Sequence, residues 1–291
     1  VLPAVRARMH ACEDAHRAPR RLVIVGADWS VRPGKRAVHA AIPGAGWTIE
    51  RLRPPTAGWD LEALLAAARA LGARHEAPVL VAIDAVLGLP NAFVRGAGDA
   101  GFLDALLRIR RAGGLEATCT QPAQWRPDAP FFRVAPGAGG LGRFIAAAGG
   151  RSAVLRQIEL GLGAKTVFAV SGIPGTVGAG SRALWAELAV HRDAPAETSA
   201  ESRARPLAVW PFDGGLADRL ATPGQLVLAE TYPRLAAAIA LARALPATPR
   251  GVARTKRAVR VDALERLLGL EWMRAAKAVS YTHLTLPTNR E

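Results

Sequence analysis

Apolar runs that each stop at an acidic residue mark the strands of this chain. Residues 21–30 read RLVIVGADWS and the run ends at Asp28, residues 79–90 read VLVAIDAVLGLP and the run ends at Asp84, and residues 226–233 read LVLAETYP and the run ends at Glu230. A carboxylate at the end of a buried strand lies at a sheet edge, where the core meets water. Three such strands side by side would form an oxygen-ligand site for a divalent metal. Any one of these acids can equally begin a turn or cap a helix.

The first third of the chain predicts three antiparallel strands, a helix and a fourth strand. The strands are expected over Leu22–Ala27, Arg36–Ile42 and Trp47–Leu52, and the connections between them contain Pro-Gly turn signals. Asp60 is expected to cap a helix with the sequence LEALLAAARALGARH, whose leucines recur at helical spacing. Val79–Ile83 follows this crossover helix, so it should run parallel to a neighbouring strand.

The rest of the chain predicts shorter elements in a single domain over 21–279, with an insertion at about 96–163 that is irregular over Ala117–Gly142. Further strands are expected over Lys165–Val170, Leu207–Phe212 and Gln225–Ala229, and helices over Phe102–Arg111, Arg182–His191 (beginning after Ser181), Tyr232–Leu245 and Val261–Leu270. Residues 1–20 are expected to be a disordered leader. The tail 280–291, SYTHLTLPTNRE, departs from the Ala- and Arg-rich composition and is interpreted as non-native.

Charge and cysteine content narrow the possible partners and the compartment. The formal net charge is +14, and a strongly basic surface attracts polyanions, nucleic acid above all. No apolar stretch reaches the roughly 18 residues of a membrane span. The two cysteines form no CxxC pair and no secretory signal is evident, which argues against a disulfide scaffold or a structural zinc site and favours the cytoplasm.

Five short motifs, in order, resemble one family. They are GADWS at 26–30, GKRAVHAA at 34–41, IDAVLGLP at 83–90, the segment 178–185 with its GxGS and LW, and ETYPR at 230–234. Together they resemble the domain-of-unknown-function family 429, described as predicted ribonuclease-H-like nucleases. The resemblance covers about residues 22–270. It implies an α/β fold of the ribonuclease-H-like type, with a mixed sheet and helices on both faces. Members of that family end with an acid-rich late helix, whereas this chain has only VDALERLLGL before its tail.

The resemblance also implies a chemistry. Ribonuclease-H-like nucleases use clustered carboxylates to hold two divalent cations roughly 4 Å apart, one activating water and the other stabilising the leaving oxygen. The expected cofactor is Mg²⁺ or Mn²⁺. The metal ligands and catalytic residues would be Asp28, Asp84 and Glu230. The expected phosphate contacts are Lys35, Arg182 and Arg234.

Two other functions remain open from the sequence. Actin-like kinases share this fold, and GADWSVRPGK at 26–35 looks like their first phosphate loop, with the Gly-rich SGIPGTVGAGS at 171–181 near a nucleotide. No Walker-type GxxxxGK[ST] is present, and Glu230 has no role in a kinase of this type. The third possibility is a basic nucleic-acid-binding module without turnover.

Overall fold

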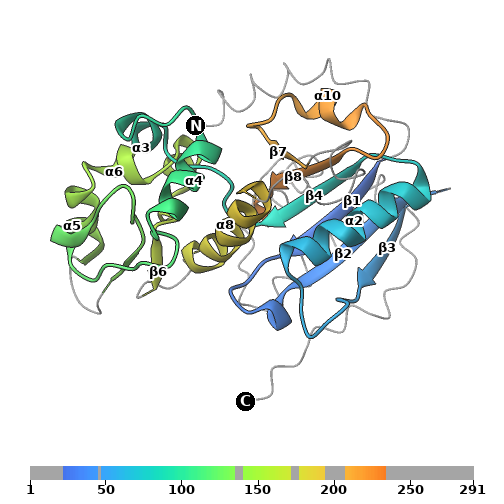
Figure 1. Cartoon of the computed structure of the whole chain (residues 1–291), viewed down its shortest axis with the longest axis horizontal. Coiled ribbons are helices and arrows are strands. Elements are labelled where there is room, and N and C mark those ends of the chain that lie inside the picture. The colour runs from blue at the N-terminus through green and yellow to red at the C-terminus, as the bar shows by residue number, and fades with distance from the viewer. Residues whose placement is uncertain (1–21, 45–46, 135–139, 172–176, 194–206, 234–291) are drawn as a thin grey trace, which may run out of the picture.

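A mixed six-stranded sheet forms one side of the molecule, on the right of Figure 1. The computed structural model describes residues 22–44, 47–134, 140–171, 177–193 and 207–233. The strand order is β3-β2-β1-β4-β8-β7. The strands are β1 (Val23–Asp28), β2 (Ala37–Pro43), β3 (Trp47–Leu52), β4 (Val79–Asp84), β7 (Ala208–Trp210) and β8 (Leu226–Glu230).

Half of this sheet is antiparallel and half is parallel. Strands β1, β2 and β3 form an antiparallel meander, whereas β4 is parallel to β1, β8 to β4 and β7 to β8. The meander and the parallel fourth strand are confirmed. The strand expected over Leu207–Phe212 is shorter than predicted. It lies at the edge of the sheet, because the last strand, β8, is inserted between it and β4.

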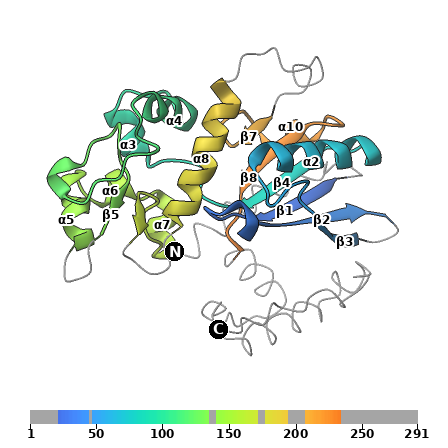
Figure 2. The same cartoon turned by 60° about the horizontal axis from the view of Figure 1, so that its bottom comes forward.

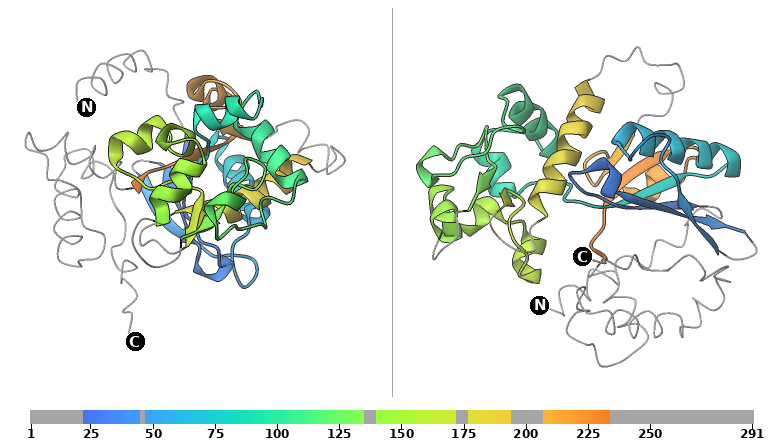
Figure 3. Two further views of the ribbon diagram at one scale, coloured as in Figure 1. Left: turned by 90° about the vertical axis from the view of Figure 1, so that its left-hand side faces the viewer. Right: turned by 90° about the horizontal axis from the view of Figure 1, so that it is seen from below.

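Helices lie on both faces of the sheet. Helix α2 (Leu61–His75) packs on one face, against the alternate buried residues of β1 and β4, and Figure 3 shows it along that side. The Asp60 side chain caps this helix as predicted, accepting a hydrogen bond from the Ala63 N–H at 2.7 Å. On the opposite face, α10 (Leu216–Leu220) closes a small apolar cluster with Ala208 and Val227.

The segment between β4 and α8 folds into a second group of elements, which we call the insertion lobe (residues 85–171; Figure 2). It contains α3 (Asn91–Gly96), α4 (Phe102–Arg111), η2 (Pro122–Gln124), β5 (Phe132–Arg133), α5 (Gly140–Ala147), α6 (Arg151–Val154), α7 (Gln157–Leu162) and β6 (Ala169–Ser171). Helix α4 has the predicted bounds. The strand expected over Lys165–Val170 is wrong in extent: only Ala169–Ser171 is extended, and it pairs with β5 in a separate two-stranded sheet. One hydrophobic core runs through both the lobe and the main sheet.

Helix α8 (Gly178–Asp193) lies between the insertion lobe and the sheet (Figures 1 and 2). It begins at Gly178, four residues before the predicted start at Arg182. A Cβ atom at Gly178 would lie 2.3 Å from the carbonyl oxygens of both Val167 and Ala169, so the helix can approach the lobe this closely only with glycine there. Trp185 of the helix packs between Phe102 and Phe131 of the lobe.

Several sequence predictions lie outside the described residues. These are the leader, the tail, Arg234, the helix over Val261–Leu270 and all but the first two residues of the helix over Tyr232–Leu245. Among the residues that the structure describes, no helix is both long enough and apolar enough to cross a membrane.

Candidate functional site at the carboxyl edge of the sheet

Asp28 and Asp84 lie side by side at the carboxyl ends of two neighbouring parallel strands. They are the last residues of β1 and β4 and are direct partners in the register of that pair. Residues paired in this way point to the same face of a sheet, on strands about 4.8 Å apart. Asp28 is exposed and Asp84 is half-buried, so this part of the sheet edge is open to solvent. Both belong to the face opposite α2, because the alternating residues Val23, Val25, Val81 and Ile83 point into the core.

Glu230 does not join this pair on the same face. It ends β8, but its register partner on β4 is Ile83, one residue before Asp84. Since side chains alternate along a strand, this offset directs Glu230 to the α2 face. The expected cluster of three carboxylates is therefore not formed. Within the described ranges, no group of three or more acidic, histidine or cysteine side chains could hold a metal ion.

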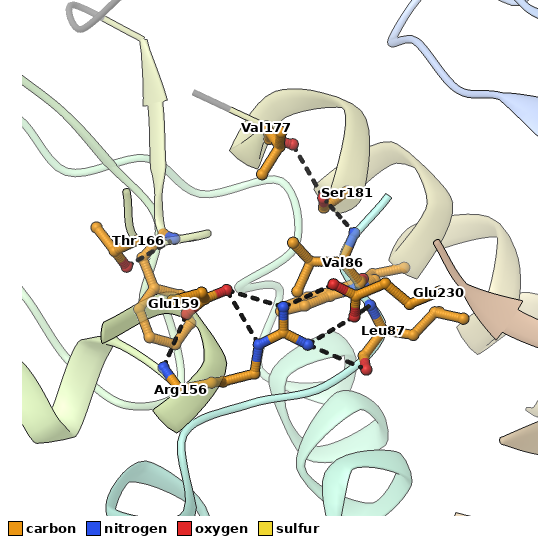
Figure 4. Close-up of polar contacts among 10 residues, drawn as sticks. Val86, Leu87, Arg156, Glu159, Thr166, Val177, Ser181 and Glu230 are labelled. Carbon is orange, nitrogen blue, oxygen red and sulfur yellow. Dashed lines mark hydrogen bonds and ion pairs between the residues drawn. The ribbon is translucent and has the colours of Figure 1, made fainter. Parts of the chain in front are cut away.

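The carboxylate of Glu230 instead forms an ion pair with Arg156, the residue before α7 (Figure 4). The two guanidinium NH₂ groups of Arg156 donate to its two oxygens at 2.6 and 2.7 Å, and the backbone N–H of Leu87 donates at 2.8 Å. The side chains of Arg156 and Glu230 are only 13% and 14% exposed. This contact joins the insertion lobe to the six-stranded sheet.

A second carboxylate completes this ion network. Glu159 accepts hydrogen bonds from the backbone N–H of Arg156 at 2.8 Å and from its Nε at 3.0 Å, and the Glu159 side chain is 1% exposed (Figure 4). Burial raises the pKa of Glu159, and the neighbouring Arg156 opposes that rise. Burial alone would lower the pKa of Arg156, but its hydrogen bonds to Glu230 and the charges of both glutamates raise it. Arg156 thus stays charged between two carboxylates.

Tyr232, two residues beyond β8, lies in the field of the same cluster. Burial raises the pKa of its phenol to about 12, and the negative charge of Glu159 adds to the rise. The phenol therefore keeps its proton above pH 10, where an ordinary tyrosine would lose it.

Thr231 takes the place next to Asp84 that Glu230 was expected to fill. Its backbone N–H donates to the carbonyl of Ile83 at 2.8 Å, which continues the β4–β8 ladder one residue past Glu230. The next pair in that register is Asp84 with Thr231, so a hydroxyl follows the two carboxylates across the sheet. This row of Asp28, Asp84 and Thr231 is the candidate site.

The position of the row in the topology is also informative. After β1 the chain continues to β2 and β3, which lie on one side of β1 in the sheet. After β4 it continues to β7 and β8, which lie on the other side. In open α/β sheets, ligands bind outside the carboxyl ends of the strands, in the crevice where the strand order reverses. Asp28 and Asp84 flank that point here.

Of the predicted phosphate contacts, Lys35 is exposed to solvent and Arg182 is directed into the insertion lobe. Lys35 is exposed at the end of the 3₁₀ turn η1 (Pro33–Lys35), between β1 and β2. Arg182 points to the insertion lobe, where it donates to the Thr118 hydroxyl at 2.7 Å and its guanidinium carbon lies 5.5 Å from the centre of the Phe131 ring. Burial lowers the pKa of Arg182.

A neighbouring arginine that the sequence did not single out has a structural role. Arg36 is buried, and its guanidinium lies 3.8 Å from the centre of the Trp29 ring. It donates to both oxygens of Glu187 on α8, at 2.7 and 3.2 Å, and to the carbonyls of Ser30 and Trp59. This residue fixes the loop after Asp28 against α8.

The sequence reasoning missed Arg156 and Glu159. A local signal existed, since a glutamate at the third position of a helix often accepts from the backbone before the helix, as Glu159 does here. The contact of Arg156 with Glu230 spans 74 residues and has no local signal. Comparison of the chain with protein-family models, with curated proteins and with solved structures found no match.

Proposed function

We propose that this protein hydrolyses phosphodiester bonds of nucleic acid with a divalent metal held by Asp28 and Asp84. The observation that carries this proposal is the direct register pairing of the two aspartates on one face, at the point where the strand order reverses. A meander followed by a helix-connected parallel strand supports a ribonuclease-H-like relationship. The net charge of +14 supports a polyanionic substrate. A cytoplasmic location belongs to the same proposal.

The residues present fit one metal ion better than a pair. Mg²⁺ is commonly bound through one or two carboxylates, waters and substrate phosphate, and the two aspartates supply that number of ligands. When bound, Mg²⁺ or Mn²⁺ would polarise the phosphate and lower the pKa of a bound water. Thr231 would orient water or phosphate beside Asp84, and the exposed Lys35 would attract the phosphate backbone. Glu230 holds the protein together in this scheme and is removed from the ligand set.

The decisive experiment compares Asp84→Asn with Asp104→Asn, an exposed carboxylate on α4 that serves as a matched control. Labelled single-stranded DNA, duplex DNA and RNA are incubated with the protein in Mg²⁺, in Mn²⁺ or in EDTA. We expect cleavage by the parent protein only with metal, a loss of about 100-fold or more in Asp84→Asn, and no change in Asp104→Asn. Metal-dependent cleavage that survives Asp84→Asn would refute the role of this pair.

A phosphotransferase is the second candidate function, and one observation now favours it. One of the sequence arguments against a kinase was that Glu230 had no role in one, and its ion pair with Arg156 supplies a structural role. The absence of a Walker-type loop still counts against a kinase. Two aspartates at the ends of adjacent strands then suit a Mg²⁺–nucleotide complex as well as a phosphodiester. Thermal stabilisation by Mg²⁺–ATP that is lost in Asp84→Asn, without any nuclease activity, would establish this alternative.

Metal-independent, salt-sensitive nucleic-acid binding without turnover would point to a binding module.

A further inference from the structure

The insertion lobe contains a hollow that the proposed active site does not use. It has a volume of about 440 Å³ and is lined by residues from the segment 117–129. Its polar lining comes from Thr118, Cys119, Gln124 and Arg126, and small alanine side chains form the rest of the wall. The hollow is wide open to solvent, and its volume lies in the range of sites that bind drug-sized ligands.

Tertiary contacts hold the wall of this hollow in place. The Thr118 hydroxyl accepts the 2.7 Å hydrogen bond from Arg182 of α8. The backbone of Cys119 pairs with the small sheet, through a bond from its N–H to the Phe131 carbonyl at 3.0 Å. The Trp125 indole N–H donates to the Pro130 carbonyl at 3.1 Å. The hollow is therefore formed before any ligand binds.

The chemistry of the lining suits a phosphorylated ligand with a polar ring. The side chain of Arg126 is 69% exposed and has only a loose contact of 3.5 Å with Asp128, so its guanidinium is available to a phosphate. The amide oxygen of Gln124 accepts from the Gln121 N–H at 3.3 Å, which leaves the amide NH₂ as the donor to a ligand. A guanidinium for phosphate and an amide for a base edge are the groups that proteins use to bind nucleotides.

The first turn of α8 connects the hollow to the row of Asp28, Asp84 and Thr231. A Cβ atom on Gly180 would lie 3.3 Å from the carbonyl oxygen of Trp29, directly after Asp28. The Ser181 hydroxyl accepts from the N–H of Val86, two residues after Asp84, at 2.9 Å. The next residue, Arg182, reaches Thr118 in the wall of the hollow. Gly180 and Ser181 thus lie next to the loops after the two aspartates, and Arg182 contacts the wall of the hollow.

We propose that the hollow binds one unstacked nucleotide of a single-stranded nucleic acid whose neighbouring phosphates pass the first turn of α8 toward Asp28 and Asp84. Arg126 contacts the phosphate of that nucleotide and Gln124 contacts its base edge. An unpaired strand is required, because only an unstacked base can enter a pocket of this kind. This inference rests on the proposed function for its substrate class and adds a second binding position and a strand state.

The test measures binding in EDTA, so that cleavage does not interfere. Fluorescence anisotropy with a labelled single-stranded 12-mer and with the matching duplex is recorded over a salt series for the parent protein, Arg126→Gln and Arg74→Gln. Arg74 is an exposed arginine on α2 and is the charge-matched control. We expect tighter binding of the single strand, an affinity loss of about five- to tenfold in Arg126→Gln, and a log–log salt slope smaller by about one. Arg74→Gln should leave both quantities unchanged.

Cys119 provides a second readout inside the hollow. The chain has two cysteines, so a Cys12→Ser background leaves Cys119 as the single thiol. Saturating single-stranded 12-mer should slow alkylation of Cys119 by iodoacetamide at least fivefold, whereas free nucleoside monophosphate at the same nucleotide concentration should protect less. Equal protection by both would identify a site for free nucleotides and overturn the strand proposal.

The outcomes separate this inference from the proposed function. If Arg126→Gln weakens binding and Cys119 is protected while no metal-dependent cleavage exists, the inference stands and the nuclease proposal fails. If cleavage requires Asp84 but Arg126→Gln behaves like Arg74→Gln, the nuclease proposal stands and the inference is overturned. A failure of the parent protein to bind any oligonucleotide in EDTA also overturns the inference.

Discussion

Replacing Glu230 by glutamine distinguishes a structural carboxylate from a metal ligand. The substitution preserves the shape of the side chain but removes its negative charge. It also replaces by an NH₂ donor one of the two oxygens that accept hydrogen bonds from Arg156 and from the backbone N–H of Leu87. Breaking a buried ion pair costs roughly 3–5 kcal/mol. Because the two side chains are 14% and 13% exposed, we take the lower end and expect a loss of about 3 kcal/mol in the free energy of unfolding.

If Glu230 were a metal ligand, the same substitution would not lower the free energy of unfolding of the metal-free protein. Carboxylates that gather to hold a cation repel one another when no cation is bound, so neutralising one would leave the metal-free protein equally or more stable. The measurement is urea unfolding in EDTA, followed by tryptophan fluorescence and circular dichroism, for the parent protein, Glu230→Gln, Arg156→Met and the double variant. The double-mutant cycle should give a coupling energy of about 2 kcal/mol or more. A Glu230→Gln protein as stable as the parent, or a coupling energy near zero, would refute the structural assignment.

Two further predictions test the packing of α8 and the electrostatics of the ion network. Gly178→Ala places a Cβ atom 2.3 Å from two carbonyl oxygens and should lower the free energy of unfolding by about 3 kcal/mol, whereas Gly142→Ala in α5, where a Cβ atom meets nothing within 4 Å, should be neutral or slightly stabilising in the same urea titration. Between pH 10 and about 12, the unfolded chain releases the Tyr232 proton that the folded protein retains, so stability should fall as the pH rises through this window. Tyr232→Phe should reduce that slope by somewhat less than one proton, and an unchanged slope would contradict the raised pKa.

Much of the fold was predictable because local signals agreed with the tertiary arrangement. Helix α2 has its cap at Asp60 and leucines at helical spacing, and both features act within a few residues of one another. The strands of the meander are joined by connections too short for a parallel crossover, so neighbours must be antiparallel. The insertion lobe was harder to predict, because α6 and α7 are short helices that depend on distant partners. Helix α6 packs against α3 and α5, and Arg156 at the start of α7 bonds to Glu230 of β8.

The candidate site shows the boundary between sequence and structure most clearly. That Asp28, Asp84 and Glu230 end buried strands could be read locally, because an apolar run that stops at an acid is a short-range pattern. Which of them lie together depends on how the strands pair in the folded sheet. The register of β8 against β4 is offset by one residue from the register of β4 against β1 at their acidic ends. Because side chains alternate between the two faces of a sheet, that single-residue offset turned Glu230 toward Arg156 and made Thr231 the residue that follows in register with Asp84.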